Sequence, residues 1–269
     1  MLRKILNEYI YGKKLFQPLF EKMHFISLYG MNIGSPIDVN TSGEAYAISS
    51  IEHKFINEDS IIIFDIGANQ GQFTAVALSV LKKINNKLKI FAFEPQKAAY
   101  EECTKTLNSS AVELFNYGFS DTEGIKTLFR NNDISTLSSL YETDCLYEPE
   151  FSKDRVEINL TTIDSFIDKN KIDKIHYLKM DVEGHEFSIL KGAEQALKEK
   201  RIEMIQFEFG NVNAISRVFM KDFFDLLGDR YNLYRLLKDG IQKISQYNGN
   251  VEIYNTAIYL AINKDLDAE

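Results

Sequence analysis

Acidic side chains stand where several apolar, strand-like runs of this sequence end, and a histidine follows one of them. They are Glu94, Asp181, Glu183, His185 and Glu208. Carboxylates accept hydrogen bonds from hydroxyl groups, and carboxylates and imidazoles can accept a proton during a reaction. In open parallel sheets, ligands bind beyond the carboxyl ends of the strands. We therefore expect these five side chains to converge on one cleft.

A glycine-containing turn follows the first buried strand that the sequence predicts. The run Ile61 to Phe64 has the continuous apolar character of a strand covered on both faces, and Asp65 follows it. Gly67 and Gly71 allow a sharp turn before a helical apolar period resumes. Such a turn also serves dinucleotides, phosphates or plain packing, but its Gly-x-x-x-Gly spacing differs from the Gly-x-Gly-x-x-Gly of dinucleotide binders.

The next predicted strand, 88–93, ends at Glu94, and a helix lies between the two strands. A right-handed crossover places both strand ends on one edge of the sheet, so Glu94 arrives beside the glycine turn. A carboxylate in this position can accept hydrogen bonds from both hydroxyls of a ribose. The alternative is a solvated carboxylate at a strand end.

These motifs resemble those of the FkbM-type methyltransferases, a class I family that depends on S-adenosyl-L-methionine. The matching blocks are Phe64-Asp65-Ile66-Gly67-Ala68-Asn69-Gln70-Gly71, Phe93-Glu94-Pro95, Thr162-Ile163-Asp164, Lys179-Met180-Asp181-Val182-Glu183-Gly184-His185-Glu186 with Leu190 and Gly192, and Phe207-Glu208. They span about residues 44–210. The resemblance implies O-methylation of a hydroxyl group on a sugar, a glycan precursor or a related natural product.

The resemblance implies S-adenosyl-L-methionine as cofactor and assigns a set of residues to its binding. The expected residues are Glu44, Asp65, Gly67, Ala68, Asn69, Gly71, Glu94, Asn116, Tyr117 and Asp181. Asn116 and Tyr117 follow the third strand, where such folds often contact the adenine. Glu44 begins a helix and is expected to reach the amino group of the cofactor, although it also favours the helix dipole there.

Because a sulfonium methyl is already electrophilic, the protein needs to align an acceptor oxygen in line with it and remove a proton. His185 is the first candidate for the general base and Asp181 the second, while Glu183 and Glu208 are expected to face the acceptor. An alternative role for His185 is to orient Glu183 or Asp181 from a helix start.

A metal-dependent variant is also open. Asp181 and Glu208 resemble the carboxylates with which catechol-type O-methyltransferases hold Mg²⁺, an ion that suits hard oxygen ligands and lowers the pKa of a bound hydroxyl. The sequence lacks a complete ligand set for this ion.

The pattern of strands and helices predicts a Rossmann-like α/β fold with a mostly parallel, seven-stranded central sheet and helices on both faces. Residues 44–269 are expected to form the methyltransferase domain, and residues 1–43 a helical extension. The extension contains an amphipathic helix over 2–23, interrupted near Gly12 and Pro18. This helix is expected to act as a lid over the substrate, to bind a membrane surface, to form a contact in a homo-oligomer, or to pack on the main domain. Residues 119–160 predict a turn, a short strand and a mobile loop.

Composition limits the possible partners. The formal net charge of −8 argues against nucleic acid, which binds to basic surfaces, and favours a small-molecule or glycan acceptor. The two cysteines have neither zinc-site spacing nor disulfide density. No apolar run suits a signal peptide or a transmembrane segment, so a cytoplasmic protein is expected.

Two other classes of protein stay open. An NAD(P)-dependent oxidoreductase would also use Gly67 and Glu94, although it would favour a different glycine spacing and would not need the acids at 181, 183 and 208. A catalytically silent binding protein could keep the fold without the chemistry.

Overall fold

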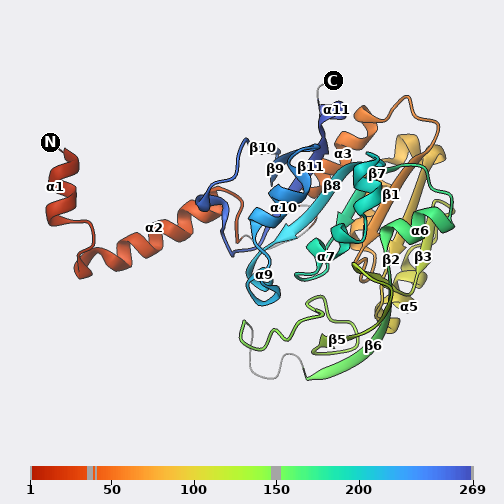
Figure 1. The fold of residues 1–269 in the computed structure, drawn as a ribbon, viewed down its shortest axis with the longest axis horizontal. Coiled ribbons are helices and arrows are strands. Elements are labelled where there is room, and N and C mark those ends of the chain that lie inside the picture. Colours follow the sequence, from red (N-terminus) through yellow and green to blue (C-terminus); the bar gives the residue numbers. More distant parts are fainter. Residues whose placement is uncertain (1, 35–38, 40, 147–152, 268–269) are drawn as a thin grey trace.

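The computed structural model describes residues 2–34, 39, 41–146 and 153–267. Its main feature is a central sheet of eight strands in the order β10-β9-β11-β8-β7-β1-β2-β3 (Figure 1). The strands are β1 Ile61–Ile66, β2 Leu88–Phe93, β3 Val112–Phe115, β7 Ile175–Met180, β8 Ile202–Phe209, β9 Tyr231–Leu237, β10 Gly240–Ile244 and β11 Ala257–Asn263.

The helices are α1 Leu2–Tyr9, α2 Gln17–Gly30, α3 Glu44–Lys54, α4 Gln72–Val80, α5 Lys97–Thr106, α6 Ile163–Lys169, α7 Glu186–Lys191, α8 Glu194–Lys198, α9 Asn211–Ser216, α10 Met220–Leu227 and α11 Lys264–Asp267. Short 3₁₀ helices cover Lys14–Phe16, Lys82–Lys87 and Gly249–Val251.

Five strands of the central sheet, β3, β2, β1, β7 and β8, are parallel, and β11 lies antiparallel between β8 and β9. This confirms the predicted Rossmann-like, mostly parallel sheet. The predicted number of seven strands is wrong by one, because the chain turns back after β9 and adds β10 at the edge. That turn is made by Lys238 and Asp239, whose polar character does not by itself distinguish a hairpin from a loop.

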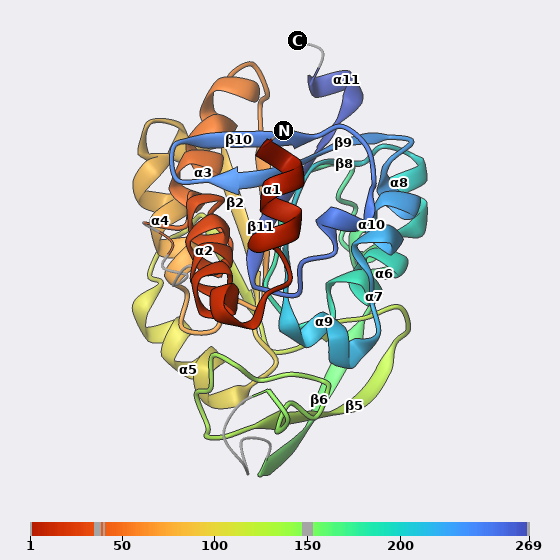
Figure 2. The ribbon, with the colours of Figure 1, turned by 90° about the vertical axis from the view of Figure 1, so that its left-hand side faces the viewer.

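Both faces of the sheet are buried, as its continuous apolar strands predict. Side chains of β1 alternate between the two faces, with Ile61 and Ile63 in one core and Phe64 and Ile66 in the other. Helices α3 and α4 cover the first face, and α6, α7, α8 and α10 cover the second (Figure 2). The ends of β1, β2, β7 and β8 align in register, so the residues that follow them reach one edge of the sheet.

The turn after β1 requires glycine. Gly67 has a φ of +78°, and a Cβ atom there would lie 1.9 Å from the carbonyl oxygen of Asp181. Gly71 has a φ of +86° and packs against Cys103 on α5 and Leu107, which follows that helix. The sharp turn that the sequence predicts is therefore confirmed, and its backbone lies in direct contact with the end of β7.

A second, three-stranded sheet lies beyond the carboxyl edge of the central sheet, in the order β4-β6-β5 (Figure 1). Its strands are β4 Gly118–Phe119, β5 Gly124–Arg130 and β6 Asp154–Thr161. The turn and the short strand predicted within residues 119–160 therefore belong to this three-stranded sheet. The segment 131–146 connects toward β6, and residues 147–152 lie outside the described part of the chain.

Helices α1 and α2 extend away from the central sheet (Figure 1). Gly12 has a φ of +71° and separates them, as predicted, whereas Pro18 lies in the first turn of α2 and does not interrupt it. Leu28 is the buried residue of α2, while Leu19 and Ile26 are more than half exposed. The division of the chain at residue 43 and the role of the extension stay predictions.

The two cysteines have different environments. Cys103 is buried in α5, and burial raises the pKa of its thiol to about 12, together with the charges of Asp65 and Glu94. Cys145 is exposed, in the segment that follows Tyr141. Among the described residues, no helix is both long and apolar enough to cross a membrane.

Candidate active site

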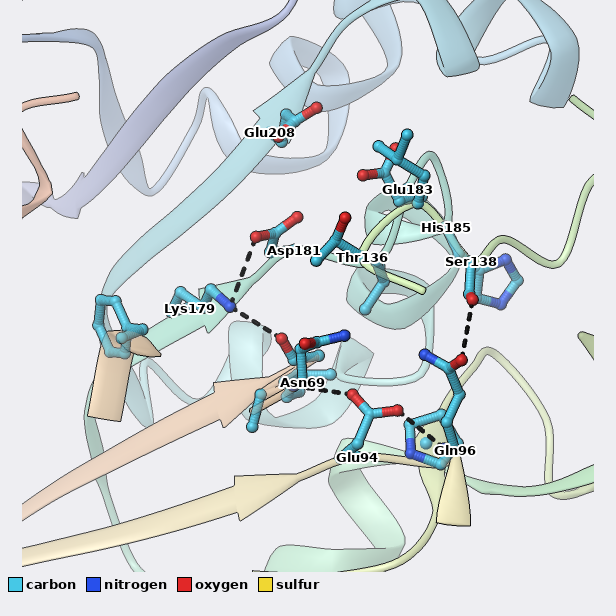
Figure 3. Close-up of a pocket in the computed structure, with 18 of the residues that line it drawn as sticks. Asn69, Glu94, Gln96, Thr136, Ser138, Lys179, Asp181, Glu183, His185 and Glu208 are labelled. Atoms are coloured by element: carbon cyan, nitrogen blue, oxygen red, sulfur yellow. Dashed lines mark hydrogen bonds and ion pairs between the residues drawn. The ribbon is translucent and has the colours of Figure 1, made fainter. Parts of the chain in front are cut away.

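A cavity of about 660 Å³ opens at the carboxyl ends of β1, β2, β7 and β8 (Figure 3). Nine of the residues expected at the site line it: Glu44, Gly67, Ala68, Asn69, Glu94, Asp181, Glu183, His185 and Glu208. Four others, Asp65, Gly71, Asn116 and Tyr117, do not line it. The predicted convergence of the strand-end acids on one cleft is therefore present in the structure.

Glu94 lies between the glycine turn and the start of α5. Its Oε2 accepts a hydrogen bond from the backbone N–H of Asn69 at 2.8 Å, and its Oε1 accepts one from the backbone N–H of Gln96 at 2.8 Å. Burial raises the pKa of Glu94 to about 7. Each carboxylate oxygen has a second lone pair, so the group can still accept from two hydroxyl donors. This geometry fits a ribose diol.

Residues 135–138 form hydrogen bonds with residues around Glu94 in this part of the cavity. The carbonyl oxygen of Ser135 accepts hydrogen bonds from Asn69 Nδ2 at 3.1 Å and from Gln96 Nε2 at 3.0 Å. Ser138 Oγ donates to Gln96 Oε1 at 3.0 Å. These contacts place residues 135–138 over the turn that holds Glu94. Sequence reasoning identified this run only as part of a loop, because nothing in it shows which residues its backbone meets.

Lys179 is a buried cation that lines the cavity. Its Nζ lies 3.0 Å from Asp65 Oδ1 and 3.7 Å from Asp181 Oδ2, and it donates a hydrogen bond to the carbonyl oxygen of Gly67 at 3.1 Å. Burial alone would lower the pKa of Lys179, but the carboxylates of Asp65, Asp181 and Glu44 outweigh it and raise the pKa above its usual value. The ammonium group therefore ties the glycine turn to the end of β7.

Asp65 is fully buried and faces Lys179, not the cavity. Thr74 Oγ1 donates a hydrogen bond to its Oδ2 at 2.7 Å. Asp65 therefore does not line the cavity in which the cofactor is expected, and it supports the turn through Lys179. Gly71 likewise acts in packing, against α5.

Asn116 and Tyr117 also lie outside the cavity. Asn116 Nδ2 donates to the carbonyl oxygens of Glu94 and Pro95, and the Tyr117 ring packs against Phe93 and Phe115. The structure thus does not place them at an adenine site. They fix the chain after β2 and β3, while Gly118 and Phe119, which come next in the sequence, line the cavity.

Glu44 reaches the opposite wall of the cavity from the start of α3. Its Oε1 accepts a hydrogen bond from Gln206 Nε2 at 2.7 Å, and its Oε2 accepts one from Ser42 Oγ at 3.0 Å. Burial raises its pKa. Gln206 on β8 therefore holds the Glu44 side chain in place. The charge of Glu44 can also interact favourably with the helix dipole of α3.

Glu183 and Glu208 differ from the other acids, because within the described residues neither carboxyl group makes a hydrogen bond or an ion pair. Burial raises both pKa values well above their usual range. The charges of Asp181 and Glu186 add to this at Glu183, and the charge of Glu183 is the largest further cause at Glu208. Glu183 has a φ of +51°, and its carbonyl oxygen accepts a hydrogen bond from Ser139 Oγ at 2.7 Å. Backbone conformations of this kind are often found at functional sites.

His185 is buried, and both of its ring nitrogens have partners. Nε2 lies 2.9 Å from Ser120 Oγ, and Nδ1 lies 3.0 Å from Tyr141 OH. Burial lowers its pKa to about 4, so the ring is neutral near pH 7. This geometry argues against His185 as the general base and favours the alternative in which it orients the turn that carries Glu183.

The structure gives no support to the magnesium site. Within the described part of the chain, no group of three or more His, Cys, Asp or Glu side chains is arranged to hold a metal ion. Asp181, one of the two expected ligands, is already beside the Lys179 ammonium group.

Comparison with known proteins gives a family and two named relatives. Residues 65–236 match the family described as "Methyltransferase FkbM domain". Hexuronic acid methyltransferase AglP of Haloferax volcanii is 24% identical over 155 residues, which are 57% of this chain and 58% of that protein. Methyltransferase sdnD of Sordaria araneosa is 26% identical over 191 residues, covering 56% of this chain and 72% of the relative.

Among solved structures, the plantazolicin methyltransferase BpumL in complex with SAH is 12% identical and has a TM-score of 0.43. The similarity covers 92% of this chain and 91% of that one. The strand order of the central sheet, and not this similarity, is what assigns the fold.

Proposed function

We propose that this chain, which belongs to the FkbM methyltransferase family, uses S-adenosyl-L-methionine to methylate a hydroxyl group of a sugar, a glycan precursor or a related natural product. The observation that carries this proposal is the division of the cavity. Glu94 and the glycine turn lie on one side, and Glu183 and Glu208, whose carboxyl groups have no partner among the described residues, lie on the other (Figure 3). The name of the Haloferax relative supports a sugar acceptor.

The residues around the glycine turn fit the cofactor. Glu94 can accept from a ribose diol, and Gly67 lets the turn pass the carbonyl group of Asp181, which a Cβ atom would obstruct. Glu44 and Asp181 offer carboxylates for the amino group. When bound, S-adenosyl-L-methionine supplies an electrophilic methyl group that an acceptor oxygen attacks directly, without a covalent enzyme intermediate.

Glu183 is the proposed general base. Burial and neighbouring carboxyl groups raise the pKa of both Glu183 and Glu208, and such a pair favours holding one proton between its two members. We assign that proton to Glu208 and the ionised form to Glu183. Glu183 then orients the acceptor hydroxyl and accepts its proton, while protonated Glu208 donates a hydrogen bond to another acceptor oxygen. His185, tied to Ser120 and Tyr141, holds the turn that positions Glu183.

The proposed function is tested by incubating the protein with S-adenosyl-L-methionine and a panel of methyl glycosides. We expect release of S-adenosylhomocysteine together with a methyl ether on the sugar, identified by mass spectrometry and NMR. Binding of NADH, with no binding of S-adenosylhomocysteine, would instead favour an oxidoreductase. Cofactor binding without transfer to any hydroxyl acceptor would contradict O-methylation.

The proposed contact between Glu94 and the cofactor can be tested by changing the pH and by replacing Glu94 with glutamine. The ionised carboxylate accepts best from a diol, and its pKa is about 7, so S-adenosylhomocysteine should bind several-fold more tightly at pH 8 than at pH 6. Glu94→Gln should weaken binding at pH 8 by roughly tenfold to a hundredfold, as expected for loss of hydrogen bonds to a charged group, and should remove the pH dependence. Isothermal titration calorimetry measures both effects. Glu113→Gln, at an exposed carboxylate paired with Lys89, is the control, and equal affinity for both variants would exclude the ribose contact.

A further inference from the structure

The charged residues around the cavity are almost all acidic. Its lining includes five carboxyl groups, from Glu44, Glu94, Asp181, Glu183 and Glu208. Among the described residues that line it, Lys179 is the one lysine or arginine. A ligand that brings a carboxylate into this space needs a cation to compensate for the loss of water.

Lys179 is not available for that purpose. Its side chain is only 4% exposed, and its ammonium group already lies beside Asp65 and Asp181 while donating to the carbonyl oxygen of Gly67. Turning it toward a ligand would leave the fully buried Asp65 carboxylate without its charge partner, which is costly.

The cations nearest to His185 are engaged elsewhere. Lys126 and Lys191 lie 3.8 Å and 3.3 Å from the carboxylate oxygens of Asp121, and neither lines the cavity. His185 itself is neutral near pH 7, with both ring nitrogens in contact with hydroxyl groups. No cation in the described part of the cavity wall is thus free to pair with an anionic acceptor.

Within the described residues, no protein donor or cation pairs with the carboxyl groups of Glu183 and Glu208 on the acceptor side of the cavity. Resting on the proposed function, we propose that the acceptor of this chain, unlike the hexuronic acid in the name of the Haloferax relative, is a neutral or amine-bearing sugar. The cavity wall then discriminates against a uronic acid. Hydroxyl or ammonium groups satisfy the two carboxyl groups, whereas an acceptor carboxylate adds a like charge with no compensating cation. Like-charge juxtaposition of this kind opposes binding strongly.

Three matched acceptors test the inference: the methyl glycosides of glucose, glucosamine and glucuronic acid. The measured quantity is kcat/KM from release of S-adenosylhomocysteine, at low ionic strength so that screening is small. We expect the glucosaminide to be used at least as well as the glucoside. The glucuronide should be used at least about tenfold less well, a difference of about 1.4 kcal/mol, because like charges oppose its binding.

A variant that adds a cation to the wall gives a second measurement. Thr136 is exposed and lines the cavity, and its side chain makes no hydrogen bond within the described residues. Thr136→Lys should raise the use of the glucuronide relative to the glucoside by at least about threefold, since a cation within reach of a carboxylate stabilises it. Thr127→Lys makes the same change on the exposed face of β5 and should leave the ratio unchanged.

The outcomes separate the inference from the proposed function. Equal use of the glucuronide and the glucoside, or equal effects of the two lysine variants, would overturn the inference while sugar methylation stands. Absence of product with all three glycosides would overturn the proposed function, and the inference with it.

Discussion

Replacing Lys179 with methionine is expected to lower the free energy of unfolding by about 3–5 kcal/mol, the usual cost of removing one partner of a buried ion pair. The reason is that Asp65, which is 0% exposed, keeps its charge but loses the ammonium group 3.0 Å away. For a domain of this size the change corresponds to a fall in Tm of roughly 10 °C. The carbonyl oxygen of Gly67 also loses its donor, so S-adenosylhomocysteine should bind more weakly.

Two further variants make the result specific. Lys174→Met removes a lysine that is 41% exposed and paired with Glu203, so it should cost no more than about 1 kcal/mol. The double variant Lys179→Met with Asp65→Asn removes the unpaired charge and should recover much of the stability. Equal denaturation midpoints for Lys179→Met and Lys174→Met would show that the buried ammonium group does not hold the turn.

Replacing Glu183 with glutamine is expected to reduce kcat by about 10²–10⁴-fold, the range typical of a lost general base. The glutamine has nearly the same shape but cannot accept the proton of the hydroxyl group. Since Glu183 lies on the acceptor side, the Kd for S-adenosylhomocysteine should change little. Glu194→Gln, at an exposed carboxylate on α8 paired with Lys198, is the control and should keep full activity.

The pH profile gives a second readout for Glu183. Burial and the neighbouring Asp181 and Glu186 raise its pKa, and only the ionised form accepts a proton, so kcat/KM should rise with pH through this raised pKa. The rise should disappear in Glu183→Gln. If Asp181→Asn abolishes turnover while Glu183→Gln does not, the general base is Asp181, the second candidate that the sequence indicates.

The sequence predicts the fold because its strongest signals are local. Continuous apolar runs, each followed by an acid or a glycine, identify β1, β2, β7 and β8, and the right-handed crossover rule then brings their ends together. Glu94 and the acids at 181, 183 and 208 accordingly reach one cavity, as predicted.

What the sequence does not reveal depends on register and on contacts between distant segments. Lys179 stands in an otherwise apolar strand, which is an unusual place for a lysine, but its partner follows only from the pairing of Asp65 with Lys179 across β1 and β7. The hydrogen-bond partners of His185 are Ser120 and Tyr141, which belong to a region in which the sequence predicts mainly a turn and a loop. Asn116 and Tyr117 were expected at the cavity because they follow a strand, yet the chain turns their side chains toward the backbone after β2 and toward the core.

The different environments of the two cysteines make the unaltered chain suitable for labelling with a fluorescent dye at one position. A maleimide reacts with a thiolate, and Cys103, which is buried and has a pKa of about 12, offers almost none at neutral pH. Cys145 is exposed and follows the segment that contributes Ser135 to the cofactor side and Tyr141 to His185. A dye on Cys145 would therefore report how that segment responds when cofactor and acceptor bind, without removal of any native residue.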